Sequence, residues 1–408
     1  MENKIAIIYG TRPEFLKVYP IILECSRRKI NFITINTGQH TNLVTEMEKI
    51  FKFSPDYCLK VQNSNYNNTD LVASLLNNLS IILKKEKFNK VIAQGDTFTV
   101  LASSMMSFLE KIDFYHVEAG LRTNNIYKPF PEEYNRRVTS ITTTFNFAPT
   151  DKAKLNLLNE NIPKSKIIVT GNTIIDLLKY IIKTKKIKIK KDNKVLITAH
   201  RRENIGENLT NICKAISDLA KENPKIIFYW SLHPNPEVSS QVKKNFVSKS
   251  DNLKLIESLN YIENVKLMSE CLLLISDSGG IQEEAPSLKK KILILRDETE
   301  RPEVLDCGCG VLVGSDINKI KSDPKLSKFI TPSYKYNGDV NGKYIIDPKT
   351  GEQTTYVGSL QFYDYRKGNK IFKLVSGGNE NDLKLLNGFN DKKGNAYSIL
   401  LDNNSYKE

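Results

Sequence analysis

The chain has 408 residues, a formal net charge of +14, 40% hydrophobic residues and 26% charged residues. This length exceeds one typical core and predicts two domains, and no stretch approaches the roughly 20 apolar residues of a membrane span. Lysine is spread along helices and linkers without the aromatic interleaving of a single-strand groove, so we expect no nucleic-acid or membrane partner and attribute to the charge only an attraction for anionic ligands.

The cysteines and the N-terminus both indicate a reducing compartment. Six cysteines show neither a small secreted framework nor the C-x2-C pairs of a zinc site, so we expect reduced thiols and no metal. The chain runs directly into a strand, without the charged region and apolar core of a signal peptide. We therefore expect a cytoplasmic protein.

Short apolar strands alternate with helix-length segments over the first 315 residues, which is typical of βαβ units and parallel sheets. In the first half a closing helix is predicted at 173–182, so a Rossmann-like domain is expected over residues 1–182. Its strands are predicted at residues 4–9, 31–36, 90–93, 113–117, 146–148 and 166–169.

A lysine-rich segment over residues 183–193 is predicted to be a solvated linker, after which the pattern restarts. A second Rossmann-like domain is expected over residues 194–318, facing the first across a cleft. Its strands are predicted at residues 195–198, 226–230, 253–256, 272–275, 292–295 and 311–313. The fold class is therefore α/β, with two doubly wound domains.

Residues 319–408 differ in character, because glycine, asparagine, lysine and tyrosine dominate and neither histidine nor cysteine occurs. Short strands are predicted at 343–347, 359–365 and 370–375, between turns. This tail is expected to be either a small β-rich appendage or partly disordered, and the sequence assigns it no role.

Each of the four histidines, His40, His116, His200 and His233, ends an apolar strand. Ligands of open α/β sheets gather outside the carboxyl ends of the strands. The set therefore predicts one shared cleft or two facing clefts, although any one of these histidines alone is more typical of a structural residue.

The first loop, Gly10-Thr-Arg-Pro-Glu14, follows a buried strand and precedes a helix with Pro13 in its first turn. Arg12 offers a planar fork suited to diphosphate, and Lys17 adds a second cation about one helical turn later. The alternative is that Arg12 pairs with Glu14.

Three acids follow or closely trail predicted strand ends: Asp96, Glu118 and Glu132. We expect them to converge, and clustered carboxylates raise one another's pKa, which suits a general acid and a general base. Arg136 or Arg137, about one turn after Glu132, would offset their charge. Singly, each acid is more typical of a helix cap or a salt bridge.

The segment Ser276-Asp-Ser-Gly-Gly-Ile-Gln-Glu-Glu284 predicts a nucleotide-diphosphate site in the second domain. A strand is expected to end at Asp277 and a helix to begin near Ile281. Ser278 offers a hydroxyl, and Gly279 and Gly280 allow the backbone to approach a ligand whose phosphate meets the free N–H groups of the helix start. The alternative is a tight turn without a ligand.

Further polar residues of the second domain lie near predicted strand ends. Glu283 or Glu284 is placed to accept hydrogen bonds from ribose hydroxyls, and His200 to contact the ligand. His233 lies in a loop broken by two prolines. Arg296 begins a charged segment that either lines the same cleft or caps a helix.

As a set, these residues resemble the UDP-N-acetylglucosamine 2-epimerase family, which has the GT-B-type fold shared with many nucleotide-sugar glycosyltransferases. The resemblance covers about residues 3–315, in family order. It rests on Gly10-Thr-Arg-Pro-Glu14, Thr37-Gly-Gln-His40, Gln94-Gly-Asp-Thr97, His116-Val-Glu-Ala-Gly-Leu-Arg122, Pro131-Glu-Glu-Tyr-Asn-Arg-Arg137, Gly171-Asn-Thr173, Ala199-His-Arg-Arg-Glu-Asn204, Ser276 to Leu288 and Thr299-Glu-Arg-Pro-Glu303.

The resemblance implies conversion of UDP-N-acetylglucosamine to UDP-N-acetylmannosamine for polysaccharide biosynthesis, without metal or redox cofactor, in a protein that is commonly a homodimer. C2 loses its proton as UDP departs, and UDP adds back after reprotonation on the other face. The implied catalytic residues are Asp96, Glu118, Glu132, His200, Lys17 and Arg136. The implied UDP contacts are Arg12, His200, Ser278, Gly279, Gly280, Glu284, Tyr261 and Arg296. Gln39, Glu133 and His233 match a regulatory substrate site of some bacterial members.

Two departures from the family pattern concern the uracil and the chain end. The position of an aromatic residue near the uracil aligns with Asn264, and the nearest aromatic residue is Tyr261. The glycine-containing motif and returning helix that usually end the family are not recognisable after Gly314, and residues from about 320 onward differ from it.

Other functions remain open on the sequence. A hydrolysing epimerase would release UDP and free N-acetylmannosamine, but Pro13 and Glu14 favour the non-hydrolysing branch. A glycosyltransferase of this fold is less favoured, because three acids suit proton transfers better than a simple displacement. The alternative from another class is a non-catalytic UDP-sugar-binding or regulatory module. A 6-deoxy amino-sugar nucleotide is a further candidate substrate, and the sequence does not assign which acid serves which face.

Overall fold

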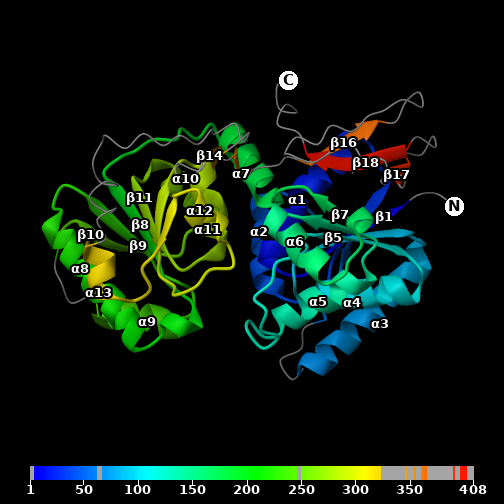
Figure 1. Ribbon diagram of the computed structural model, residues 1–408, viewed down its shortest axis with the longest axis horizontal. Helices are drawn as coiled ribbons and strands as arrows, with labels where there is room; N and C mark the ends of the chain where they lie inside the picture. The colour runs from blue at the N-terminus through cyan, green and yellow to red at the C-terminus, as the bar shows by residue number, and fades with distance from the viewer. Residues whose placement is uncertain are drawn as a thin grey trace. The chain divides into compact units, whose positions relative to one another are not determined.

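The computed structural model describes residues 4–61, 67–245 and 250–322, together with the tail segments 345–346, 353–354, 360–364, 389–390 and 396–401. The chain forms two compact units (Figure 1). One comprises Met1–Leu177 and Thr355–Glu408, and the other Leu178–Thr354. The division falls within helix α7 (Thr173–Thr184). The domain bounds derived from the sequence stay predictions.

The first unit contains a seven-stranded parallel sheet of order β3-β2-β1-β4-β5-β6-β7. Apolar side chains of its strands, such as Ile8 and Val91, pack in one cluster with residues of α3 and α4. The strands are β1 (Ile5–Tyr9), β2 (Phe32–Asn36), β3 (Tyr57–Cys58), β4 (Lys90–Gln94), β5 (Asp113–Val117), β6 (Phe145–Ala148) and β7 (Ile167–Val169). The helices before α7 are α1 (Arg12–Arg27), α2 (Thr41–Ile50), α3 (Asn68–Glu86), α4 (Phe98–Leu109), α5 (Glu132–Thr142) and α6 (Asp151–Asn159).

The second unit contains a six-stranded parallel sheet of order β10-β9-β8-β11-β12-β13 over its own core. The strands are β8 (Lys194–Thr198), β9 (Ile227–Ser231), β10 (Leu253–Ile256), β11 (Leu273–Ser276), β12 (Lys291–Ile294) and β13 (Gly310–Leu312). The helices are α8 (Glu207–Glu222), α9 (Pro236–Asn245), α10 (Tyr261–Glu270), α11 (Gly279–Ser287), α12 (Glu303–Asp306) and α13 (Ile317–Ser322).

The prediction of an α/β fold with two doubly wound parallel sheets is confirmed. Every strand predicted before residue 315 is present, with ends that agree to within one residue, and β3 was missed because two residues carry no periodicity. In each sheet the strand order reverses once, between β1 and β4 and between β8 and β11. Ligands of open α/β sheets bind at such switch points.

Most residues of the lysine-rich linker are exposed, as expected, and the end of the linker is also held by hydrogen bonds. The Lys190 and Asp192 backbone N–H groups donate to the carbonyl oxygens of Ser269 and Glu270, at 2.9 and 2.8 Å. The buried Lys290 ammonium donates to the carbonyl oxygens of Lys190 and Cys271. The linker is thereby fixed at the end of α10 through its own backbone groups and not through its own lysine side chains.

The described segments of the tail beyond residue 322 are strands. β14 (Ile345–Ile346) pairs antiparallel with β15 (Gln353–Thr354), and β16 (Leu360–Asp364), β18 (Ala396–Leu401) and β17 (Phe389–Asn390) form a small antiparallel sheet. β14 and β16 fall on the strands predicted at 343–347 and 359–365, whereas the one predicted at 370–375 lies outside the described residues. No helix in the described part of the chain is long and apolar enough to cross a membrane.

Candidate active site

A buried glutamate joins the two loops at the first switch point. Glu14, in the first turn of α1, accepts hydrogen bonds from the backbone N–H groups of Gly10 and Thr11 at 2.7 and 2.8 Å. Its other carboxylate oxygen accepts from the hydroxyl of Thr97, which caps α4. Burial raises the pKa of Glu14 to about 7, against the effect of these hydrogen bonds. Glu14 is thus a capping and bridging residue, and the Arg12 side chain is exposed to solvent.

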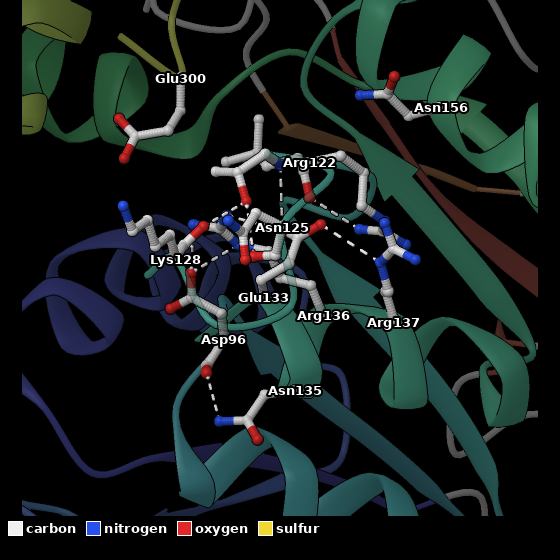
Figure 2. A network of polar contacts seen from close by, with 12 residues as sticks. Asp96, Arg122, Asn125, Lys128, Glu133, Asn135, Arg136, Arg137, Asn156 and Glu300 are labelled. Carbon is white, nitrogen blue, oxygen red and sulfur yellow. Dashed lines mark hydrogen bonds and ion pairs between the residues drawn. The ribbon is translucent and has the colours of Figure 1, made fainter. Parts of the chain in front are cut away.

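Asp96 lies in the loop between β4 and α4 and is paired with a residue of α5. Arg136 donates to Asp96 Oδ2 from Nε at 2.9 Å, and its Nη2 lies 2.7 Å from the same oxygen. Arg136 Nη1 lies 3.3 Å from Glu133 Oε2, so the guanidinium is held between two carboxylates (Figure 2). Glu132 is the first residue of the same helix. Helix α5 therefore carries one predicted acid, Glu132, and pairs with another, Asp96, through Arg136.

Glu118 follows β5 in the left-handed region, with φ of 64°. A non-glycine residue in this conformation is strained, and such strain is common at functional sites. Lys17 Nζ forms an ion pair with Glu118 Oε2, which also accepts from Gln94 Nε2 at 2.8 Å. The sequence predicted mutual repulsion among the acids. In the structure Glu118 pairs with Lys17 and Asp96 pairs with Arg136, one of the two arginines expected to offset the charge of the acids.

Asp277 joins the two loops at the second switch point. Its carboxylate is fully buried, and Oδ2 accepts from the backbone N–H groups of His200 and Arg201 at 2.7 and 2.8 Å and from Asn204 Nδ2 at 2.9 Å. Oδ1 lies 3.2 Å from His200 Nδ1. The His200 ring stacks on His233, with centroids 4.9 Å apart and planes 6° apart. His200, predicted to contact the diphosphate, therefore stacks on His233, predicted to belong to a regulatory substrate site.

Helix α11 begins at Gly279, two residues earlier than the sequence predicted, and Ser278 is its N-cap. A Cβ atom at position 279 would lie 2.7 Å from the guanidinium carbon of Arg301, so a larger residue there would displace that guanidinium. Arg301 Nε donates to Glu283 Oε1 at 2.6 Å, which fixes the guanidinium beside the helix start. Sequence reasoning missed Arg301 because its position depends on contacts with residues about 20 positions away.

Glu284 and Arg296 are both engaged within the second unit. The Tyr261 hydroxyl donates to Glu284 Oε1, and burial together with the Glu284 charge raises the pKa of Tyr261 well above its ordinary value. Arg296 donates to Glu203 Oε1 and Glu300 Oε2 at 2.7 and 2.8 Å. Burial alone would raise the pKa of Glu300, but the hydrogen bond from Arg296 and the nearby arginine charges lower it to about 2.

His116 corrects the expectation that all four histidines line a cleft. Its ring is fully buried, Nε2 lies 2.7 Å from the Gly95 carbonyl oxygen, and burial lowers the pKa to about 4. Its apparent strand-end position is the fourth of five residues in β5. His116 is therefore an interior residue behind the Asp96 loop.

The other residues predicted for regulation lie in the interior of the first unit. Gln39 Oε1 accepts from the Thr99 backbone N–H at 3.0 Å and from its hydroxyl at 2.8 Å. Glu133 is fully buried and also accepts from the Thr123 backbone N–H at 3.1 Å. Within the described residues, no group of three or more histidine, cysteine, aspartate or glutamate side chains is arranged to hold a metal ion.

Comparison with known proteins finds a family that matches most of the chain. Residues 23–345 match the family model described as UDP-N-acetylglucosamine 2-epimerase. A protein of that name from Neisseria meningitidis is 44% identical over 348 residues, covering 81% of this chain and 92% of the relative. The match to the family model ends at residue 345, past residue 320, from which the sequence analysis expected a departure from the family.

Two solved structures are similar over most of the chain. The crystal structure of UDP-GlcNAc 2-epimerase from Neisseria meningitidis bound to UDP-GlcNAc has a TM-score of 0.74 and 39% identity, covering 83% of this chain and 96% of that one. The Methanocaldococcus jannaschii UDP-GlcNAc 2-epimerase in complex with UDP-GlcNAc and UDP has a TM-score of 0.70 and 33% identity, covering 82% and 96%.

Proposed function

The chain belongs to the UDP-N-acetylglucosamine 2-epimerase family, and we propose that it interconverts UDP-N-acetylglucosamine and UDP-N-acetylmannosamine without hydrolysis. The observation that carries the proposal is the pair of carboxylates at the first switch point, each with its own cation. Such groups suit proton transfer at C2, where one base removes the proton and one acid returns it to the opposite face.

The first unit supplies the acid and base chemistry. Asp96, Glu118 and Glu132 are the proposed proton-transfer groups, and Lys17 and Arg136 hold two of them in place. As the C2 proton leaves, the bond between C1 and the UDP oxygen breaks, which yields a glycal and UDP. Re-addition of UDP at C1, with a proton delivered to the other face of C2, completes the conversion without loss of atoms.

The second unit holds the nucleotide. We propose that Ser278, Gly279 and Gly280 bind the diphosphate through the start of α11, together with His200. Arg12 of the first unit is a further proposed diphosphate contact. The remaining proposed contacts are Glu284 for the ribose, Tyr261 near the uracil and Arg296 near the phosphates. Preorganised donors at the departing UDP stabilise the charge that develops there and retain UDP for re-addition.

Regulation by substrate is a finer proposal, in which Gln39, Glu133 and His233 respond to a second nucleotide sugar. The stacking of His233 on His200 supports it, because a ligand that displaced one ring would move the other. Calorimetry with UDP-N-acetylglucosamine tests it. Two binding events in the wild type and one in His233→Ala are expected, whereas two events in the variant would contradict the proposal.

We also propose a homodimer that works in the cytoplasm. Phe108, Leu109 and Ile141, at the ends of the adjacent helices α4 and α5, are 64%, 70% and 71% exposed, and exposed apolar groups of this kind mark interfaces. None of the six cysteines forms a disulfide, which is typical of a reducing compartment. Sedimentation should give a dimer for the wild type and a monomer for Leu109→Asp; a wild-type monomer would contradict the proposal.

Proton NMR of the protein with UDP-N-acetylglucosamine in D2O tests the activity. Deuterium at C2 together with UDP-N-acetylmannosamine is expected. Free N-acetylmannosamine with UDP would instead establish hydrolysis. UDP binding without any exchange at C2 would contradict the proposal and favour a binding protein or another sugar.

A further inference from the structure

Two interior side chains hold the backbone of the loop that carries Asp96. His116, on β5, donates from Nε2 to the Gly95 carbonyl oxygen at 2.7 Å. Asn135, on α5, donates from Nδ2 to the Asp96 carbonyl oxygen at 2.8 Å (Figure 2). Donation to a carbonyl also fixes which amide atom is nitrogen. Two consecutive carbonyl groups of one loop are therefore each bound by a side chain from a different element.

These polar side chains occupy buried positions where apolar side chains would give a more stable folded protein. Asn135 and His116 are 0% exposed, yet Asn135 Oδ1 and His116 Nδ1 have no hydrogen-bond partner within the described part of the protein. Asn146, which pairs with His116 in the β5–β6 register, is also 0% exposed, and neither of its amide atoms hydrogen-bonds to any described residue. Unsatisfied buried polar atoms lower stability, so their presence behind this loop indicates a role other than packing.

Helix α5 connects this backbone support to two proposed acids. Asn135 holds the Asp96 carbonyl, and the next residue, Arg136, holds the Asp96 carboxylate. Glu132 is the first residue of the same helix. A displacement of the Asp96 loop away from α5 would therefore change the position of Asp96 relative to Glu132.

We propose that Asn135 and His116 are positioning residues that fix the Asp96 loop for proton transfer at C2, an inference that rests on the proposed role of Asp96. Catalytic groups must be held to a fraction of an ångström, because small misplacements lower turnover strongly. The proposed UDP contacts lie on other loops. Loss of either positioning residue should therefore lower turnover and leave UDP affinity intact.

The first test replaces Asn135 with leucine, which is similar in size and cannot donate. Turnover should fall by about 10- to 100-fold. UDP affinity should change by less than about twofold, because the proposed nucleotide contacts lie on other loops, whereas a general loss of structure would weaken both. Asn78→Leu is the matched control, since Asn78 donates to the Ser74 carbonyl oxygen on α3 at 2.8 Å, away from this loop. Unchanged turnover in Asn135→Leu would overturn the proposal.

The second test compares His116→Phe, which cannot donate, with His116→Gln, which can. His116→Phe should lower turnover, His116→Gln should recover part of it, and His116→Phe should have little further effect in an Asp96→Asn background. Full additivity of the two substitutions would contradict the positioning role.

Amide hydrogen exchange separates this inference from the proposed function. Exchange at residues 95–98 of the free protein should be faster in His116→Phe than in the wild type, whether or not substrate turns over. Equal exchange would count against the inference. A wild-type protein that shows no turnover would contradict the proposed function, while faster exchange in the variant would still support the backbone contacts.

Discussion

The switch points of the two sheets use the same device in different surroundings. At each, a buried carboxylate accepts two backbone N–H groups: Glu14 accepts those of its own loop, and Asp277 accepts those of the loop after β8. Glu14 also accepts from a hydroxyl, whereas Asp277 lies against the His200 ring. Burying a carboxylate is unfavourable unless it accepts hydrogen bonds in a defined geometry. Its use at both switch points indicates that each site depends on two loops held in fixed positions.

The surroundings of the two bridging carboxylates, Glu14 and Asp277, differ. Around Glu14 lie side-chain ion pairs, such as Lys17 with Glu118 and Arg136 with Asp96. Around Asp277 lie backbone N–H groups at the start of α11 and a stacked pair of histidines. Paired acids suit proton transfer, and backbone donors beside glycine suit an anion. The two units are therefore expected to divide the work between chemistry and nucleotide retention.

Removal of one acid should have the largest effect. Asp96→Asn and Glu118→Gln should each lower turnover by at least about 100-fold, the usual scale for acid and base groups. UDP affinity should change little, because the proposed nucleotide contacts lie elsewhere. Turnover is followed by NMR and affinity by calorimetry, with the exposed Glu110→Gln as the control. Full activity of either acid variant would remove that residue from the mechanism.

Removal of the second bridge should produce the opposite pattern. Asp277→Ala leaves the N–H groups of His200 and Arg201 without their acceptor, so the loop that carries His200 should lose its position. We expect UDP to bind about 10-fold more weakly or worse, measured by calorimetry. The control is Asp251→Asn, on the exposed surface of the same unit. Unchanged affinity would show that Asp277 does not organise the nucleotide site.

Arg12 tests whether the division between the units is complete, because it is a proposed nucleotide contact in the first unit. Arg12→Ala should weaken UDP binding by about 5- to 10-fold, the scale of one charge-assisted contact. Arg27→Ala, at the other end of the same helix and paired with Glu24, is the matched control. Equal affinity of the two variants would confine nucleotide binding to the second unit.

Glu14 should make stability depend on pH in a defined window. Its pKa is raised from an ordinary 4.5 to about 7 by burial, so the folded state prefers the protonated form. The stability contributed is fully present below pH 4.5 and is lost as pH rises towards 7, by on the order of 2–3 kcal/mol. Glu14→Gln should therefore gain stability relative to the wild type between pH 5 and 7. The melting temperatures of both proteins at pH 5 and pH 7 test this. An equal difference between the variant and the wild type at the two pH values would contradict it.

Local patterns were enough to select candidate residues for the first unit's site. Asp96 and Glu118 could be selected because each follows an apolar strand, and parallel strands end at one edge of a sheet. The capping box of Thr11 and Glu14 is also a local pattern, but the sequence analysis considered for Glu14 only a pair with Arg12. The start of α11 was predicted two residues late, because Gly279 and Gly280 resemble a turn although they belong to the helix.

The sequence by itself determined the two parallel sheets, the loops at their switch points and the residue types those loops carry, because strand periodicity and turn residues are local. Only the tertiary structure decided which charges meet. Lys17 and Glu118 are 101 residues apart, and Arg136 and Asp96 are 40 apart. It also decided that His116 supports a loop from the interior. Such pairings depend on strand order and helix packing, which bring distant residues together and leave no short-range pattern in the chain.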